Sequence, residues 1–210
     1  TEMRADSVLD KIENMVQAHR GIWDDPFRIL ITAILSTRTK DEVTDRASLR
    51  LFCKFPHAKE LSRADADEVK ELIKPVGFYS SKARAVIETA KIIEEKFNGK
   101  VPDKMSSLLE LPGVGRKVAS IVLSYGFGKN AIAVDTHVQR ISYRLGLTNS
   151  KDPEKTEVIL KKLISRERWN DVNSYFVSFG KIICKPKNPR CDVCSLKYEC
   201  KYWRSHEGSR

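Results

Sequence analysis

The sequence has no uninterrupted apolar run of the roughly 18–20 residues that a membrane-spanning helix needs. Its first twenty residues are charged throughout, without the apolar centre of a signal peptide. It also has no low-complexity linker, so any two lobes are expected to pack closely. We therefore expect a protein of the cytoplasm or nucleoid that has no membrane partner.

Strand-forming patterns are nearly absent. The apolar run at residues 131–134 is too short to carry a sheet. Elsewhere, apolar residues recur at helical spacing between short turns, and Asn98-Gly99 is a typical helix end. The sequence therefore predicts an all-α fold. Expected helices begin near Ser7, Pro26, Asp41, Ala66, Ser80, Ser106, Arg116, Asp135, Pro153 and Trp169.

Acidic residues are outnumbered, with 28 Asp+Glu against 38 Lys+Arg and a net charge of +10. A basic domain suits a polyanion, and nucleic acid is the commonest one. Charge alone leaves open the alternative of a merely solvated lysine-rich surface. With 41% hydrophobic residues among 210, the chain can form a packed core, which argues against a disordered tail.

Cysteine is scarce outside one segment near the C-terminus. Four of the five cysteines lie within seventeen residues in the pattern C-x6-C-x2-C-x5-C, namely Cys184, Cys191, Cys194 and Cys200. Four such thiolates can bind one metal centre. Zinc sites usually combine two close pairs, whereas here only one pair is close, which favours an iron–sulfur cluster. Zinc and two disulfides remain alternatives, and Cys53 is expected to be an inert core thiol.

Residues 111–117, LPGVGRK, connect two expected helices. Gly113 and Gly115 permit backbone angles that other residues avoid, and their amides can converge with the free N–H groups of the next helix. Such a nest suits a phosphate. An ordinary helix–helix turn is the alternative for a lone GxG, but the full string is typical of a helix-hairpin-helix DNA-binding turn.

LPGVGRK, AVDTH at residues 133–137 and the cysteine segment together resemble the endonuclease III family of DNA glycosylases. Further landmarks follow in the family's order along nearly the whole chain: DPFRILITAILSTRTKD, GFYSSKA and NGKVP. The resemblance implies a helix-hairpin-helix glycosylase fold. In the family, that fold has two closely packed helical lobes, a DNA cleft between them and a C-terminal [4Fe–4S] cluster loop. We expect residues 22–134 to form a six-helix domain containing the hairpin. Residues 1–21 and 135–210 would form a second helical domain that carries the cluster.

The resemblance implies that Lys117 is a nucleophile. In the family, a lysine here attacks the sugar C1′, displaces the base and forms a Schiff base, after which β-elimination nicks the strand. The attacking amine must be uncharged, a state that desolvation and a helix N-terminus both favour. Relatives with a hydroxyl residue here tend to lack the lyase step, so Lys117 implies the bifunctional type. Without this context, it would be interpreted as a solvated lysine.

Asp135 matches the aspartate of the family's VDTH-type sequence. A carboxylate near C1′ would stabilise the positive charge that develops on the sugar, and it could move protons to and from Lys117. Asp135 is also a standard helix N-cap candidate, and the two roles are compatible.

The resemblance also implies contacts with damaged double-stranded DNA. Two loops, residues 35–41 and 77–82, would fill the gap left when the base is flipped out. Arg38 stands where the family usually has glutamine, which leaves its contact to the orphan base open. Phe78 occupies the wedge position, although a core position is the alternative. The other expected DNA contacts are Gly113, Gly115, Arg116, His137, Lys185, Lys187 and Arg190.

The expected function is therefore that of a monomeric, bifunctional DNA glycosylase and AP lyase for oxidised pyrimidines. The alternatives are a mismatch-specific thymine or uracil glycosylase and a non-catalytic iron–sulfur DNA-binding protein. Pure binding would need neither the lysine nor the aspartate, which argues against the last of these.

Overall fold

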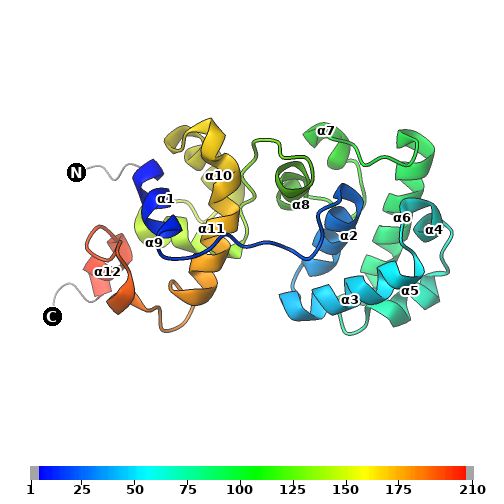
Figure 1. Cartoon of the computed structure of the whole chain (residues 1–210), viewed down its shortest axis with the longest axis horizontal. Coiled ribbons are helices and arrows are strands. Elements are labelled where there is room, and N and C mark those ends of the chain that lie inside the picture. The colour runs from blue at the N-terminus through cyan, green and yellow to red at the C-terminus, as the bar shows by residue number, and fades with distance from the viewer. Residues whose placement is uncertain (1–4, 207–210) are drawn as a thin grey trace. The chain divides into compact units, whose positions relative to one another are not determined.

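The computed structural model describes residues 5–206, and every regular element within them is helical, which confirms the all-α prediction. The chain divides into two compact units (Figure 1). The central unit is Gly21–Lys129, and the terminal unit comprises the described parts of Thr1–Arg20 and Asn130–Arg210. The expected central domain, residues 22–134, ends later than this unit. Residues 1–4 and 207–210 of the expected second domain lie outside the described residues.

The central unit contains seven α-helices, one more than expected. The additional helix is α4, whose five residues are too few to show a helical period. The final helix continues into one π-helical turn, Val122–Gly126 (η1). The seven helices are α2 (Pro26–Ser36), α3 (Asp41–Lys54), α4 (Ala58–Ser62), α5 (Ala66–Ile73), α6 (Tyr79–Phe97), α7 (Met105–Leu108) and α8 (Arg116–Ile121).

Helix α2 lies at the centre of this unit and packs against α3, α6, α8 and η1. Its start follows from local chemistry, because the Asp25 carboxylate accepts from the Arg28 N–H at 3.0 Å and Pro26 fits the first turn. Six of its eleven residues are buried and apolar. A helix with apolar residues on most sides is expected to be enclosed by other helices, as α2 is.

Helix α6 is the longest element, and both of its ends have left-handed backbone. It follows Phe78 (φ 55°) and ends at Asn98 (φ 53°), which was the predicted stop. The helix packs against α2, α4 and α5. This packing places the first turn of α6 close to the C-terminal end of α2, next to the candidate site.

The terminal unit is formed by α1 (Ala5–Glu13), α9 (Thr136–Leu145), α10 (Pro153–Leu163), α11 (Trp169–Ile182) and α12 (Lys201–His206). Phe176 and Phe179 of α11 are almost wholly buried in its core. The Arg168 guanidinium ties α1 to α11, with oxygens of Asp10 at 2.8 Å and Asp171 at 3.1 Å and an ion pair to Glu13.

Several predicted boundaries differ from the structure. Helix α1 ends at Glu13, well before His19, and Asp41 is the first residue of α3 rather than its cap, which is Lys40. Helix α12 was not predicted. The apolar run at residues 131–134 is buried but belongs to no strand. Among residues 5–206, none of the helices combines the length and the apolar character required to cross a membrane.

The turn between α7 and α8 packs closely against its neighbours. Gly113 adopts φ 76°, and a Cβ added there would lie 3.0 Å from Ile34 Cγ2 of α2. The Thr89 hydroxyl of α6 donates to the carbonyl of Pro112 at 3.0 Å. Gly115 differs from Gly113, because its backbone is extended and a Cβ would meet no atom within 4 Å. The turn therefore requires glycine at position 113 but not, for its own conformation, at position 115.

Replacing Gly113 by alanine should therefore destabilise the protein. Left-handed backbone and the contact with Ile34 should together lower the free energy of unfolding by about 1–3 kcal/mol. The matched variant Gly115→Ala should stay within about 0.5 kcal/mol of the parent. Urea unfolding followed by circular dichroism measures both, and equal destabilisation by the two substitutions would contradict this account of the turn.

Candidate active site and cysteine pocket

Lys117 is the second residue of α8 and follows directly from the glycine turn. Its side chain is half-buried, and Val118 and Ala119 beside it are buried and anchor the helix. The turn thus places an amine at the beginning of a helix whose position is fixed by packing against α2. Gly113 and Gly115 are exposed, while Arg116 is half-buried.

The loop after α2 and the loop before α6 lie together in the central unit. The N–H of Gly77 donates to the Thr39 hydroxyl at 3.0 Å, and a Cβ at Gly77 would lie 3.0 Å from the Arg38 carbonyl oxygen. Arg38 and Phe78 both have left-handed backbone, with φ 53° and 55°. The Arg38 guanidinium carbon lies 5.7 Å from the centroid of the Phe78 ring, within the range of a cation–π contact.

Phe78 is an exposed side chain rather than a core residue, with 62% of its surface accessible. Arg38 is also exposed. The structure therefore brings together two of the residues predicted to contact DNA, Arg38 and Phe78.

Sequence reasoning missed Lys82, which is 8% exposed in the first turn of α6. Burial lowers the pKa of Lys82, and the positive charge of Lys117 lowers it further. The available signal was its helical spacing, because Lys82 lies four residues before Val86 and therefore on the predicted apolar face of α6.

Asp135 belongs to the terminal unit and caps α9, accepting from the Val138 N–H through Oδ1 at 2.8 Å. Asp135 is therefore the N-cap residue of α9. His137, the second residue of α9, is half-buried, with its Nδ1 3.1 Å from Nη2 of Arg140. Gly180 of α11 lies against this pair, since a Cβ there would be 2.6 Å from the His137 ring nitrogen.

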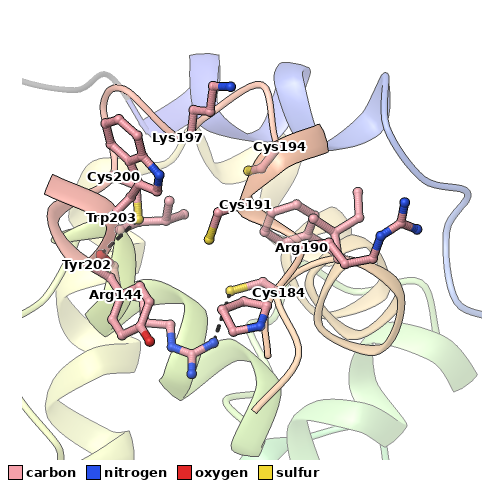
Figure 2. A pocket seen from close by; sticks show the side chains of 13 residues that line it. Arg144, Cys184, Arg190, Cys191, Cys194, Lys197, Cys200, Tyr202 and Trp203 are labelled. Atoms are coloured by element: carbon pink, nitrogen blue, oxygen red, sulfur yellow. Dashed lines mark hydrogen bonds between the residues drawn. The ribbon is translucent and has the colours of Figure 1, made fainter. Parts of the chain in front are cut away.

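The four cysteines of the C-terminal segment line a single pocket, together with Arg144, Tyr202 and Trp203. Figure 2 shows the sulfur atoms of Cys184 and Cys191 directed toward its middle. Within residues 5–206, no three His, Cys, Asp or Glu side chains form a group that could hold a metal ion. Burial raises the pKa of the Cys194 and Cys200 thiols.

Arginines from α9 hold the loop that follows Cys184. Arg144 donates to the carbonyls of Lys185 at 2.7 Å and Pro186 at 2.8 Å, and its Nη1 lies 3.5 Å from Cys184 Sγ (Figure 2). Arg140 donates to the Cys184 carbonyl at 3.0 Å, and desolvation by burial lowers its pKa. The loop backbone is thereby fixed, whereas its three predicted DNA contacts are exposed: Lys185, Lys187 and Arg190.

The expectation for Cys53 was wrong. The residue is exposed, because α3 turns Leu51 and Phe52 into the core and the next position toward solvent. An apolar neighbour in sequence does not place a residue on the same helix face, since successive residues are about 100° apart.

Comparison with known proteins places these features in a family. Residues 31–166 match the HhH-GPD superfamily base excision DNA repair protein family. The chain is 49% identical over 180 residues to endonuclease III of Thermotoga maritima, covering 86% of this chain and 84% of that protein. It is 35% identical over 196 residues to endonuclease III of Bacillus subtilis, covering 92% and 90%.

Solved structures agree with the sequence comparison. A trapped endonuclease III–DNA covalent intermediate superposes with a TM-score of 0.92 at 34% identity, covering 98% of both chains. A thermostable thymine-DNA glycosylase superposes with a TM-score of 0.85 at 24% identity, a likeness of fold alone. The chain therefore belongs to the endonuclease III family of HhH-GPD base excision DNA repair proteins, whose members are DNA glycosylases and AP lyases.

Proposed function

We propose that this chain removes oxidised pyrimidines of the thymine glycol type from double-stranded DNA and then nicks the strand, with Lys117 as the nucleophile. The observation that carries the proposal is the lysine in the first turn of α8, directly after a glycine turn that packing holds in place. A family relative of the same fold forms a trapped covalent intermediate with DNA. Monomeric state and a cytoplasmic or nucleoid location remain predictions.

The proposed reaction uses an uncharged Lys117 amine. Its nitrogen bonds to C1′ as the bond from C1′ to the base breaks, and the departing base takes up a proton. Opening of the C1′–O4′ bond gives a Schiff base. Loss of a proton from C2′ then expels the 3′ phosphate and cleaves the strand, and hydrolysis of the Schiff base releases the lysine.

Asp135 is proposed to supply the negative charge for this reaction. Its carboxylate would stabilise positive charge on the sugar as the base departs, and would carry protons to and from the lysine amine. The cap to Val138 uses Oδ1, so this hydrogen bond would hold the carboxylate in one orientation while the reaction proceeds. Capping and catalysis are therefore compatible at this residue.

The Schiff base predicts a covalent product. Borohydride should trap the protein on DNA that carries an AP site, because it reduces the imine to a stable amine. Lys117→Ala should abolish the adduct while changing the dissociation constant for the same DNA by less than about threefold, since one half-buried lysine contributes little to total phosphate contact. Denaturing gel electrophoresis and a filter-binding assay measure the two quantities.

The control for this experiment is Lys91→Ala. Lys91 is an exposed lysine of α6 that pairs with Glu88. This variant should form the adduct at the parental level. An undiminished adduct with Lys117→Ala would refute the lysine assignment.

We further propose that the four cysteines hold a [4Fe–4S] cluster. All four line one pocket, yet among the described residues they form no group suited to a metal ion. The spacing C-x6-C-x2-C-x5-C contains a single close pair, whereas zinc sites usually combine two, so the spacing favours an iron–sulfur cluster over one zinc ion. The positive charges of Arg144, Arg190 and Lys197 in the pocket lining would offset the charge of the thiolates. When bound, the cluster would cross-link Cys184, just after α11, to Cys200, which directly precedes α12.

The purified protein should therefore be brown and contain iron and inorganic sulfide in equal amounts. Cys194→Ser should reduce both, because it removes a thiolate that lines the pocket. The exposed Cys53 offers a matched control, and Cys53→Ser should leave both contents unchanged. A colourless protein containing zinc would overturn the assignment, as would a metal-free protein with two disulfides.

The preferred base is a separate question, because it depends on the shape of the base pocket. A panel of duplexes carrying thymine glycol, dihydrouracil, an AP site, G·T or G·U distinguishes the candidates. We expect the oxidised pyrimidines to be cleaved at least about tenfold faster than either mismatch, a difference of roughly 1.4 kcal/mol in activation free energy. The reverse order would indicate a mismatch glycosylase, and no cleavage even at the AP site would indicate a non-catalytic DNA-binding protein.

A further inference from the structure

A buried lysine joins the two loops that present Arg38 and Phe78. The Lys82 ammonium donates to the Leu35 carbonyl at 2.8 Å and also to the carbonyl of Thr37. It lies 3.4 Å from the Thr39 hydroxyl oxygen. The lysine belongs to α6, whereas its three acceptors belong to the end of α2 and the loop that follows. One side chain thus connects both loops.

The Lys82 ammonium is held by neutral hydrogen-bond acceptors rather than by a carboxylate. Its three acceptors are two backbone carbonyls and a hydroxyl, all uncharged. The carbonyl of Leu35 is in the last turn of α2, at the negative end of the helix dipole, which favours a cation. Burial of a lysine remains costly, as the lowered pKa of Lys82 indicates. The hydrogen bonds of the buried ammonium connect the start of α6 to the end of α2 and the loop that follows it.

The Thr39 hydroxyl is the second connection between these loops. It accepts from the Gly77 N–H at 3.0 Å and lies within reach of the Lys82 ammonium. The same two loops have left-handed backbone at Arg38 and Phe78, a conformation that residues other than glycine rarely adopt unless their surroundings hold it. The contacts of Lys82 and Thr39 provide such surroundings.

We propose that Lys82 is a positioning residue that holds the loops of residues 35–39 and 77–82 as one rigid element. Arg38 and Phe78 are then presented together to an opened duplex. The inference rests on the proposed function, because the two side chains matter only if the protein opens duplex DNA at the damaged nucleotide. A side chain that fills the gap must resist restacking of the duplex, and a loosely held loop would yield to it. Lys82 would act through the loops, not by touching DNA.

Lys82→Met tests the proposal, because methionine keeps the length and apolar stem of lysine but cannot donate hydrogen bonds. The substrates are one oligonucleotide with an AP site, used as a duplex and as a single strand. Only the duplex must be opened. We expect the single-turnover cleavage rate on the duplex to fall by about tenfold or more, since small misplacements of positioning groups have effects of this size. Borohydride trapping on the single strand should stay within about twofold of the parent.

Two controls accompany this variant. Lys91→Met removes an exposed lysine from the same helix and should change neither the duplex cleavage rate nor the single-strand trapping. Thr39→Val removes the shared hydroxyl, whereas Thr39→Ser retains it. The valine variant should resemble Lys82→Met with a smaller loss, and the serine variant should resemble the parent. This pair decides the matter if Lys82→Met does not fold, as judged by thermal unfolding.

Duplex cleavage by Lys82→Met within about twofold of the parent would overturn the proposal. An equal fold-loss in duplex cleavage and in single-strand trapping would also overturn the proposal, because it would indicate general damage to the protein rather than a defect in duplex opening. If Lys82→Met cannot be folded, equal duplex rates for the valine and serine variants would also overturn it. Failure of the proposed function is distinguishable, since the parent protein would then form no adduct with either substrate.

Discussion

The contact between Gly113 and Ile34 is the constraint on which the central unit depends. A Cβ at position 113 would lie 3.0 Å from the isoleucine methyl, so the hairpin turn can approach α2 only with glycine at that point. Helix α8 starts three residues later and places Lys117 in its first turn. The position of the proposed nucleophile therefore follows from close packing of a turn on a buried helix, more than from any hydrogen bond of its own.

The same helix α2 supports the second functional feature of this unit. The Leu35 carbonyl near its C-terminal end accepts a hydrogen bond from the buried ammonium of Lys82, and the loop that follows carries Arg38. One buried helix therefore positions both the hairpin and the loops proposed to enter DNA. In the terminal unit, α9 has a comparable double role, with Asp135 as its cap and Arg144 in its last turn beside the cysteine pocket.

Features with a local physical cause could be predicted from the sequence. Pro26, Asp135 and Asn98 mark helix ends through fixed dihedral angles and caps, and the structure has helix ends at all three. Features that depend on tertiary packing could not. Lys82 is buried because carbonyls from a distant segment surround it, and Cys53 is exposed because α3 has a second, solvated face. The basic loop and the glycine turn were recognisable through family resemblance, whereas the packing that holds them was not.

The central claim is that one lysine amine, that of Lys117, bonds to the sugar carbon. Peptide mass spectrometry of the borohydride-reduced adduct, after digestion of protein and DNA, tests it most directly. The account predicts that the remnant of deoxyribose is attached to the peptide that contains Lys117. Attachment to any other residue, including the neighbouring Lys82, would contradict the account.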